Sequence, residues 1–170
     1  PTIRDVVKGI KTILKPTGVV QFEDPYLGDV ISKTSYDQLY DEHVFLFSAH
    51  SIQYLFALEG MELIDVQPQS THGGSMRYVL ANQGAYPKKP AVDALLAEEK
   101  NQGLDRVETY KTFADKVFSS KVALVNLLKE LKGKGKRIAG YGATSKSTTI
   151  LNYCGIGPDL IDYISDTTPI

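Results

Sequence analysis

The sequence predicts an α/β protein, and three observations support that prediction. Apolar residues recur at helical spacing over residues 3–14, and short β-prone runs then separate helical stretches as far as residue 82. Residues 91–132 have almost wholly helical character, and the alternation of strand and helix resumes after residue 133. Alternating helices and strands are typical of layered α/β folds. We therefore expect two α/β sections joined by a helical connector.

The first section should contain two helices, a strand and a β-hairpin. The amphipathic helix of residues 3–14 ends at Pro16 and Gly18, and a strand follows at residues 18–23. The other expected elements are a polar loop after Tyr26, a helix capped by Ser48 and closed by Gly60, and strands at residues 62–66 and 76–80. A glycine-containing turn separates these two strands, so they can pair with each other.

In the second half of the chain, glycines mark the boundaries between the predicted elements. A linker rich in Gly, Pro and Lys covers residues 84–90, and Gly103 separates a short helix from a long one. The last elements should be a strand at residues 137–140, a helix at 146–153 and a strand at 160–165. The predicted organisation is therefore residues 1–82, a linker and helical connector at 83–132, and a small α/β unit at 133–170.

Composition places the chain among soluble globular proteins and excludes several classes. Hydrophobic residues make up 42% of the 170 residues and charged residues 23%, with a formal net charge of -1. That balance gives no attraction to nucleic acid or to an anionic membrane. No apolar run approaches the roughly 20 residues that span a bilayer, and no signal peptide is visible, so a cytoplasmic protein is expected. The lone Cys154 excludes a disulfide framework and a cysteine-built metal site, and its apolar context indicates a buried side chain.

The first group of residues that could carry chemistry is Tyr40, Glu42 and His43. An imidazole is the natural base near neutral pH and could remove a proton from a carbon next to a carbonyl. A carboxylate could hold the imidazole tautomer, and a tyrosine hydroxyl could donate to a developing enolate oxygen. Taken by composition alone, a structural histidine beside a solvated carboxylate explains these residues more simply.

The second group is the run His72, Gly73, Gly74, Ser75 and, two residues on, Arg77. Paired glycines allow positive φ angles and close approach of the backbone to a ligand. The His, Ser and Arg side chains could donate hydrogen bonds to an anion or to sugar hydroxyls. The alternative is a tight turn between two strands, with the arginine on a solvated face.

The third group is the glycine-rich run at residues 140–148, which follows a predicted strand and opens a predicted helix. Such a turn can hold a phosphate with backbone amides and the helix N-terminus. Ser145 stands where both the dinucleotide fingerprint and the P-loop have glycine, which argues against a nicotinamide or ATP site. The acidic residue expected about 20 positions further on has Asp162 and Asp166 as its nearest candidates. We favour an anion site, of the kind that binds a diphosphate, over a simple turn.

Taken together, these motifs resemble one family. The segments at residues 36–44, 71–77 and 139–146, with the run at 151–155, are similar to the bacterial sugar-nucleotide C-methyltransferases. The best-known members are the deoxysugar 3-C-methyltransferases of antibiotic pathways. The resemblance covers essentially the whole chain, with the motifs in the family's order.

The resemblance implies a fold and a reaction. Family members have an N-terminal zinc-binding part, a Rossmann-like domain that binds S-adenosylmethionine, and a C-terminal α/β domain. Residues 1–82 would be the last part of the Rossmann-like methyltransferase sheet, and residues 133–170 would be a second, small Rossmann-like unit. The reaction is methylation of a carbon next to the keto group of a nucleotide-linked sugar, through an enolate.

The resemblance also assigns roles to residues. His43 would be the base that removes the proton, while Tyr40 and Glu42 would bind or polarise the sugar. The segment from His72 to Arg77 would shape the sugar site. The turn at residues 140–146, with Tyr141 and Lys146 as its candidate contacts, would face the nucleotide of a nucleotide-diphosphate sugar.

The departures from the family pattern are large. The donor-binding glycine motif, the acidic residue that holds the ribose of S-adenosylmethionine, and the zinc-binding cysteines lie upstream in the family and are not in this chain. The chain begins at Pro1 without Met and stops just after a predicted strand. We therefore expect a fragment that is inactive alone, binds no zinc, and can self-associate through an exposed sheet edge.

Two other functions remain open. The chain could be a non-catalytic module that binds a nucleotide or nucleotide sugar through the turn at residues 140–146. Alternatively, the residues around His43 could be structural, and the chain could only scaffold a partner. The methyltransferase hypothesis is preferred because one family accounts for all three motifs.

Overall fold

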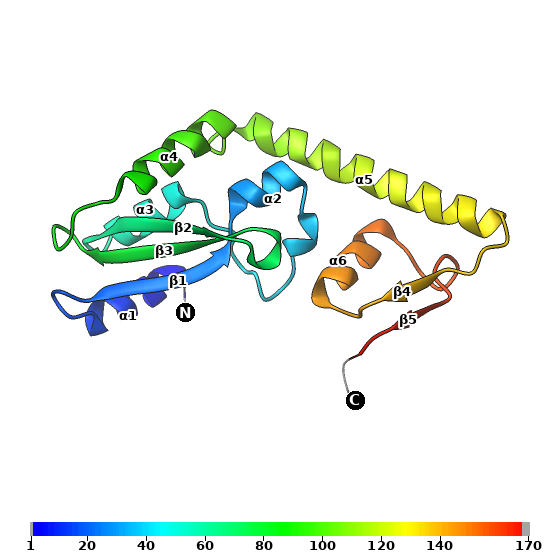
Figure 1. Cartoon of the computed structure of the whole chain (residues 1–170), viewed down its shortest axis with the longest axis horizontal. Helices are drawn as coiled ribbons and strands as arrows, with labels where there is room; N and C mark the ends of the chain where they lie inside the picture. Colours follow the sequence, from blue (N-terminus) through cyan, green and yellow to red (C-terminus); the bar gives the residue numbers. More distant parts are fainter. Residues whose placement is uncertain (1, 168–170) are drawn as a thin grey trace. The chain divides into compact units, whose positions relative to one another are not determined.

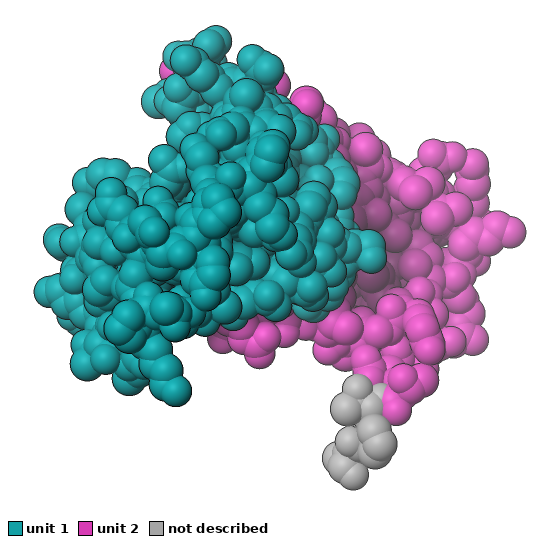
Figure 2. Space-filling model, turned by 60° about the vertical axis from the view of Figure 1, so that its left-hand side comes forward, with its two compact units in different colours: residues 1–33, 45–110 teal, residues 34–44, 111–170 magenta. Residues whose placement is uncertain are grey.

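The computed structural model describes residues 2–167, which fall into two compact units. Unit 1 comprises the residues up to 33 and residues 45–110, and unit 2 comprises residues 34–44 and those from 111 onward (Figure 2). The chain thus leaves unit 1 after residue 33 and returns to it eleven residues later. The domain boundaries predicted at residues 82 and 132 stay a prediction.

Unit 1 is built on a three-stranded antiparallel sheet in which β3 lies between β1 and β2 (Figure 1). Its elements are α1 (Ile3–Ile13), β1 (Val19–Pro25), α2 (Leu27–Lys33), α3 (Ala49–Ala57), β2 (Met61–Gln69), the short 3₁₀ turn η2 (Thr71–Gly73), β3 (Ser75–Asn82) and α4 (Pro90–Gln102). The register pairs Leu63 with Leu80 and Val66 with Tyr78, which confirms the predicted hairpin. The outer strands β1 and β2 leave the two edges of this sheet unpaired with a further strand among the described residues.

The helices of unit 1 begin at side chains that satisfy their free amides. Thr2 and Asp5 form a reciprocal capping pair at the start of α1, and Ser48 and Ser51 do the same at the start of α3. The second pair confirms the predicted N-cap. The apolar faces of these helices then pack on the sheet in one core, whose fully buried members include Val7, Ile52, Met61, Leu63, Tyr78, Leu80 and Val92.

A β-bulge in β2 fixes the start of α4. The register shifts between Leu63 and Asp65, so Ile64 has no partner on β3. The Ile64 carbonyl instead accepts a hydrogen bond of 2.9 Å from the Lys89 backbone N–H, directly before α4. The Lys89 ammonium also pairs with the Asp65 carboxylate at 2.7 Å. The Ile64 carbonyl and the Asp65 carboxylate therefore both hold Lys89, the residue directly before α4.

Unit 2 contains the predicted strand–helix–strand. Its elements are the 3₁₀ turn η1 (Tyr36–Gln38), most of α5 (Val107–Gly133), β4 (Ala139–Tyr141), α6 (Ser145–Cys154) and β5 (Tyr163–Ser165). The strands β4 and β5 pair in parallel, and α6 connects them (Figure 1). Gly103, with φ of 70°, ends α4 before α5 begins, as predicted. Cys154 is buried, as predicted.

The structure differs from the sequence prediction at α2. The residues after Tyr26 were expected to form a polar loop, but Leu27–Lys33 are helical. A Cβ atom on Gly28 would lie 2.4 Å from the Tyr26 ring, so this helix depends on a close contact that periodicity cannot reveal. Within the described residues, none of the helices is both long enough and apolar enough to cross a membrane.

The Asp65 carboxylate should make unit 1 sensitive to acid. Burial raises its pKa, but the hydrogen bonds from Lys89 and Gln67 outweigh burial and hold the pKa below its ordinary value of 3.8. A group with a lowered folded pKa stabilises the fold above its unfolded pKa and loses that contribution as the pH falls through the folded value. We expect Asp65→Asn to lower the free energy of unfolding at pH 7, with a difference from wild type that narrows below pH of about 4.

Urea unfolding measured by circular dichroism between pH 7 and pH 3 checks this expectation. Asp93→Asn is the matched control, because it removes an exposed carboxylate that pairs with Lys88 in the same region. A difference between Asp65→Asn and wild type that stays constant over the whole pH range would contradict the assignment.

Candidate active site

The predicted base lies in the segment that belongs to unit 2. Residues 34–44 contain η1, and this turn packs against α6 within unit 2. Tyr36 and Gln38 of the turn are buried, Tyr40 and His43 are half-buried, and Glu42 is exposed. The segment is therefore a loop held at its first half, with its candidate catalytic side chains in its second half.

The structure brings Tyr40 and His43 together. The Tyr40 hydroxyl lies 3.0 Å from Nε2 of His43, and the two ring centroids are 4.2 Å apart. The backbone N–H of His43 donates to the Tyr40 carbonyl at 3.0 Å, which closes a turn between the two residues. The turn brings the phenol and the imidazole to the same side of the loop.

The tautomer of His43 follows from its second nitrogen. Nδ1 lies 3.0 Å from the backbone carbonyl of Gln38. A carbonyl oxygen can only accept, so Nδ1 must carry the proton of this hydrogen bond. In the neutral ring Nε2 then has the free lone pair and accepts from the Tyr40 hydroxyl. The sequence suggested that a carboxylate holds the tautomer of the imidazole. In the structure a backbone carbonyl, that of Gln38, bonds Nδ1 instead. The Glu42 side chain is exposed.

The turn at residues 71–77 lies in unit 1. His72 is exposed and adopts a left-handed backbone conformation with φ of 55°, while Ser75 is buried and its hydroxyl donates to the Thr71 carbonyl at 3.0 Å. Arg77 donates to Glu23 at 3.1 Å and lies near Gln67 and Gln69 across the sheet. His72 and Gly73 are thus the exposed members of this set, and Ser75 and Arg77 have partners inside the unit.

Gly74 is required by the packing of this turn on α2. Its φ is 145°, and an added Cβ would lie 2.0 Å from a carboxylate oxygen of Asp29. The Gly73 carbonyl accepts from Lys33 of the same helix at 2.6 Å, and Asp29 and Lys33 pair at 3.1 Å. Gly74 therefore has a structural reason in its contact with α2, and the substrate role predicted for the paired glycines stays a prediction.

The glycine-rich turn lies in unit 2, between β4 and α6. Thr144 caps α6 by accepting from the Ser147 N–H at 3.3 Å. The backbone N–H of Ala143 in the turn donates to the Asp166 carboxylate at 2.5 Å, so the acidic residue that follows β5 folds back onto the turn. Tyr141 is 82% exposed, and Lys146 is half-buried at the start of the helix.

Comparison with known proteins places these features in a family. Residues 70–170 match the model of the C-methyltransferase C-terminal domain. That match covers more than half of the chain. The chain belongs to the C-methyltransferase family. It is 36% identical to C-methyltransferase NovU of Streptomyces niveus over 169 residues, which are 99% of this chain and 40% of that protein. The chain thus spans less than half the length of the curated relative that it matches.

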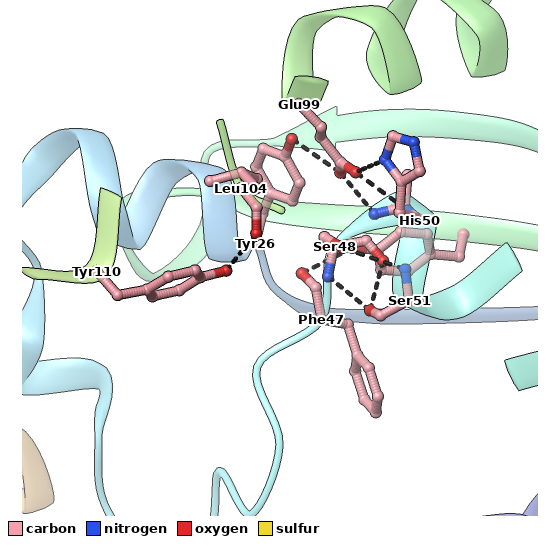
Figure 3. Close-up of polar contacts among 10 residues, drawn as sticks. Tyr26, Phe47, Ser48, His50, Ser51, Glu99, Leu104 and Tyr110 are labelled. Carbon is pink, nitrogen blue, oxygen red and sulfur yellow. Dashed lines mark hydrogen bonds and ion pairs between the residues drawn. The ribbon is translucent and has the colours of Figure 1, made fainter. Parts of the chain in front are cut away.

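The sequence did not lead us to predict one polar centre of unit 1. The Glu99 carboxylate on α4 is almost fully buried and accepts from the Ala49 N–H at 2.6 Å and the His50 N–H at 3.0 Å (Figure 3). Nδ1 of His50 lies 2.7 Å from the same carboxylate, and the Tyr26 hydroxyl donates to it at 3.1 Å. A single side chain therefore joins α4 to the N-terminus of α3 and to the end of β1.

The sequence did contain a signal for Glu99. It lies seven residues after Val92 and four after Leu95, so it shares the buried face of α4 with both. A carboxylate on such a face needs partners that replace water, and the first amides of α3 supply them. Burial and the neighbouring Glu99 raise the pKa of Tyr26, which keeps its hydroxyl a donor.

A cleft of about 600 Å³ opens beside this centre in unit 1, lined among others by His50, Ser51, Tyr54 and Lys100. The centre itself has a structural explanation, because the Glu99 carboxylate satisfies the first amides of α3 and pairs with the side chains of His50 and Tyr26. In the described residues, no group of three or more His, Cys, Asp or Glu side chains could hold a metal ion.

Removing the Glu99 carboxylate should destabilise unit 1 strongly. Glu99→Ala leaves the buried Ala49 N–H without an acceptor and opens a cavity, which should cost about 2–4 kcal/mol in the free energy of unfolding. Chemical denaturation measures this cost. Glu98→Ala is the matched control, because Glu98 is the exposed neighbour on the same helix and bonds only Gln102 among the contacts described. Equal losses in the two variants would show that the buried carboxylate is not what holds α3.

Proposed function

We propose that this chain carries the sugar-side base of a C-methyltransferase that acts on a nucleotide-linked keto-deoxysugar. His43 is the base, Tyr40 serves the enolate oxygen, and Glu42 contacts the sugar. The observation that carries the proposal is the tautomer of His43, because a carbonyl on Nδ1 leaves the lone pair on the nitrogen that faces Tyr40. The methyltransferase activity would belong to the full-length protein, and this chain alone would be inactive.

The Tyr40–His43 pair can remove one proton from carbon and donate a hydrogen bond to the oxygen that becomes negative. In the resting pair, the tyrosine hydroxyl donates to Nε2. Nε2 has one lone pair, so the hydroxyl must turn from Nε2 to the keto oxygen of the bound sugar before Nε2 can take the proton from the neighbouring carbon. The hydroxyl hydrogen is then available to the keto oxygen, on which negative charge develops as the enolate forms. Proton removal and stabilisation of the enolate are thereby coupled through one hydrogen bond.

The hydrogen bond to the Gln38 carbonyl supports the charged state of the base. After proton transfer the His43 ring is an imidazolium, in which both nitrogens donate. Nδ1 keeps its acceptor throughout, so the ring does not have to turn during the reaction. A fixed ring is what proton abstraction from carbon requires, because orientation makes a large contribution to such a step.

The remaining contacts with the substrate are proposed from the sequence motifs. The exposed His72 and Gly73 are proposed to contact the sugar, whereas Ser75 and Arg77 support the turn that carries them. Tyr141, with its exposed ring, and Lys146 are proposed to contact the nucleotide. Aromatic faces stack on bases, and an ammonium suits a diphosphate.

Methyltransferases in general take the methyl group from S-adenosylmethionine, which supplies an electrophilic methyl on sulfur. The turn at residues 140–146 does not fit as its site. The Ala143 amide of that turn is bonded to Asp166, the residue that would otherwise be free to hold a ribose. The proposal therefore places the methyl donor outside this turn.

A non-catalytic module that binds a nucleotide sugar through the same turn is the second candidate function. The parallel β4–α6–β5 arrangement favours it, since phosphates bind at such turns. The bond between Ala143 and Asp166 weighs against it, because an anion at this amide would have to displace a carboxylate. That function would also leave the Tyr40–His43 pair unused.

The proposal is tested by proton exchange at the reacting carbon. In a full-length C-methyltransferase that carries this segment, His43→Asn should lower the rate of solvent deuterium exchange at the carbon next to the keto group by about 10²–10⁴-fold. Proton NMR of the nucleotide sugar in deuterium oxide follows the exchange, and it needs no methyl transfer.

Two further variants sharpen this test. Tyr40→Phe should slow the exchange less than His43→Asn, because the base remains while the donor to the enolate oxygen is lost. His50→Asn is the matched control, because it changes a histidine that belongs to the structural centre at Glu99. Exchange that continues at the wild-type rate in His43→Asn would place the base on another residue.

A further inference from the structure

The loop that carries Tyr40 and His43 is attached to α6 at two points within unit 2. The Thr149 hydroxyl shares its one hydrogen between the Leu39 carbonyl at 3.2 Å and the Ser145 carbonyl of its own helix at 3.3 Å. The Tyr36 hydroxyl lies 3.7 Å from the Cys154 sulfur, a contact in which both groups are buried. Neither attachment involves the candidate catalytic side chains, and both come from one helix.

The first attachment is at Leu39, between the two residues that contact the His43 ring. Leu39 separates Gln38, whose carbonyl holds Nδ1 of His43, from Tyr40, whose hydroxyl meets Nε2. A hydrogen bond to the Leu39 carbonyl fixes the plane of the peptide that joins Leu39 to Tyr40, and the peptide that carries the Gln38 carbonyl is the neighbouring one in the chain. Thr149 therefore constrains the acceptor and the phenol of the His43 pair at once.

The second attachment holds the start of the loop. Tyr36 is 6% exposed, and its ring meets the Tyr153 ring edge-on with centroids 5.4 Å apart. Tyr153 is itself held by Lys121 of α5, whose ammonium donates to the Tyr153 carbonyl at 2.7 Å and lies 4.9 Å from the ring centroid. Burial, and next the contact with Cys154, raise the pKa of Tyr36 to about 12, so its hydroxyl stays neutral near the sulfur.

The helix that provides both attachments is defined at each end. Thr144 caps its first turn, and Gly155, with φ of 67°, ends it in a left-handed conformation. The two anchoring residues on α6, Thr149 and Cys154, are five positions apart, and the loop residues that they contact are three apart. A rigid helix thus holds the loop on both sides of its 3₁₀ turn.

We propose that Thr149 and Cys154 are positioning residues for the His43 pair, which act through Leu39 and Tyr36. By holding the loop, α6 of the C-terminal domain sets the tautomer and the orientation of the imidazole. This inference rests on the proposed function for its catalytic meaning. The positioning itself can be measured in this chain without sugar or methyl donor.

The measurement is the nitrogen-15 NMR spectrum of the histidine rings in the labelled chain, which contains three histidines. Wild type should show His43 mainly in the Nδ1–H form, with Nε2 unprotonated. Thr149→Val keeps the branched shape but removes the donor, and it should lower the ratio of Nδ1–H to Nε2–H forms by about two- to tenfold, the loss of one hydrogen bond. Tyr36→Phe should lower the same ratio through the second attachment.

The controls separate positioning from a loss of fold. Thr148→Val removes a hydroxyl from the same helix that bonds only to Thr144 among the contacts described, and it should leave the ratio unchanged. Thr149→Ser retains the donor and should restore the wild-type ratio. The His50 signals in unit 1, together with circular dichroism, should be the same in all variants.

The inference is overturned if Thr149→Val and Tyr36→Phe are folded and both keep the wild-type ratio, or if Thr148→Val changes the ratio as much as Thr149→Val does. Its failure is distinguishable from failure of the proposed function. A lowered ratio in Thr149→Val, with deuterium exchange retained in His43→Asn, would support the positioning while removing His43 as the base. An unchanged ratio, with exchange lost in His43→Asn, would remove the positioning role alone.

Discussion

The geometry of the candidate site depends on the backbone carbonyl of Gln38, which can accept a hydrogen bond but cannot donate one. Because this carbonyl meets Nδ1 of His43, the lone pair of the neutral ring must lie on Nε2. The Tyr40 hydroxyl then has one possible direction toward the ring, as a donor. The direction of each proton in the proposed reaction follows from that single acceptor. The carbonyl in turn is held by the 3₁₀ turn and by its contacts with α6.

The chain uses the same residue types in two different ways. At Glu99 a carboxylate, an imidazole and a phenol meet in unit 1, and the carboxylate is almost fully buried because it satisfies the first amides of α3. At His43 an imidazole and a phenol meet in unit 2, where a backbone group replaces the carboxylate and the ring stays half-buried. A buried carboxylate that is bound by backbone amides contributes to stability. An imidazole with one fixed nitrogen and one basic nitrogen is suited to proton transfer.

The sequence predicted those features whose cause is local. The hairpin of β2 and β3, the Ser48 cap and the division of the long helical stretch at Gly103 follow from periodicity and from cap and turn residues. The helix α2 was missed, because its seven residues include Gly28, and it is fixed by the Tyr26 ring and by the turn at Gly74. The site was predicted as a set of residues. The partner of His43 Nδ1 was not, because a backbone carbonyl five residues earlier has no signature in the sequence. Glu99 could have been found from its spacing to Val92 and Leu95.

Ligand titration followed by NMR tests most directly whether the sugar reaches His43 and Tyr40. A thymidine-diphosphate keto-deoxysugar is added to the labelled chain, and S-adenosylmethionine is added in a separate titration. We predict that the sugar nucleotide shifts the ring signals of His43 and Tyr40 and leaves those of His50 in place, and that S-adenosylmethionine shifts neither. Shifts confined to residues 140–146, with His43 and Tyr40 unchanged at saturation, would contradict the claim and favour a binding module.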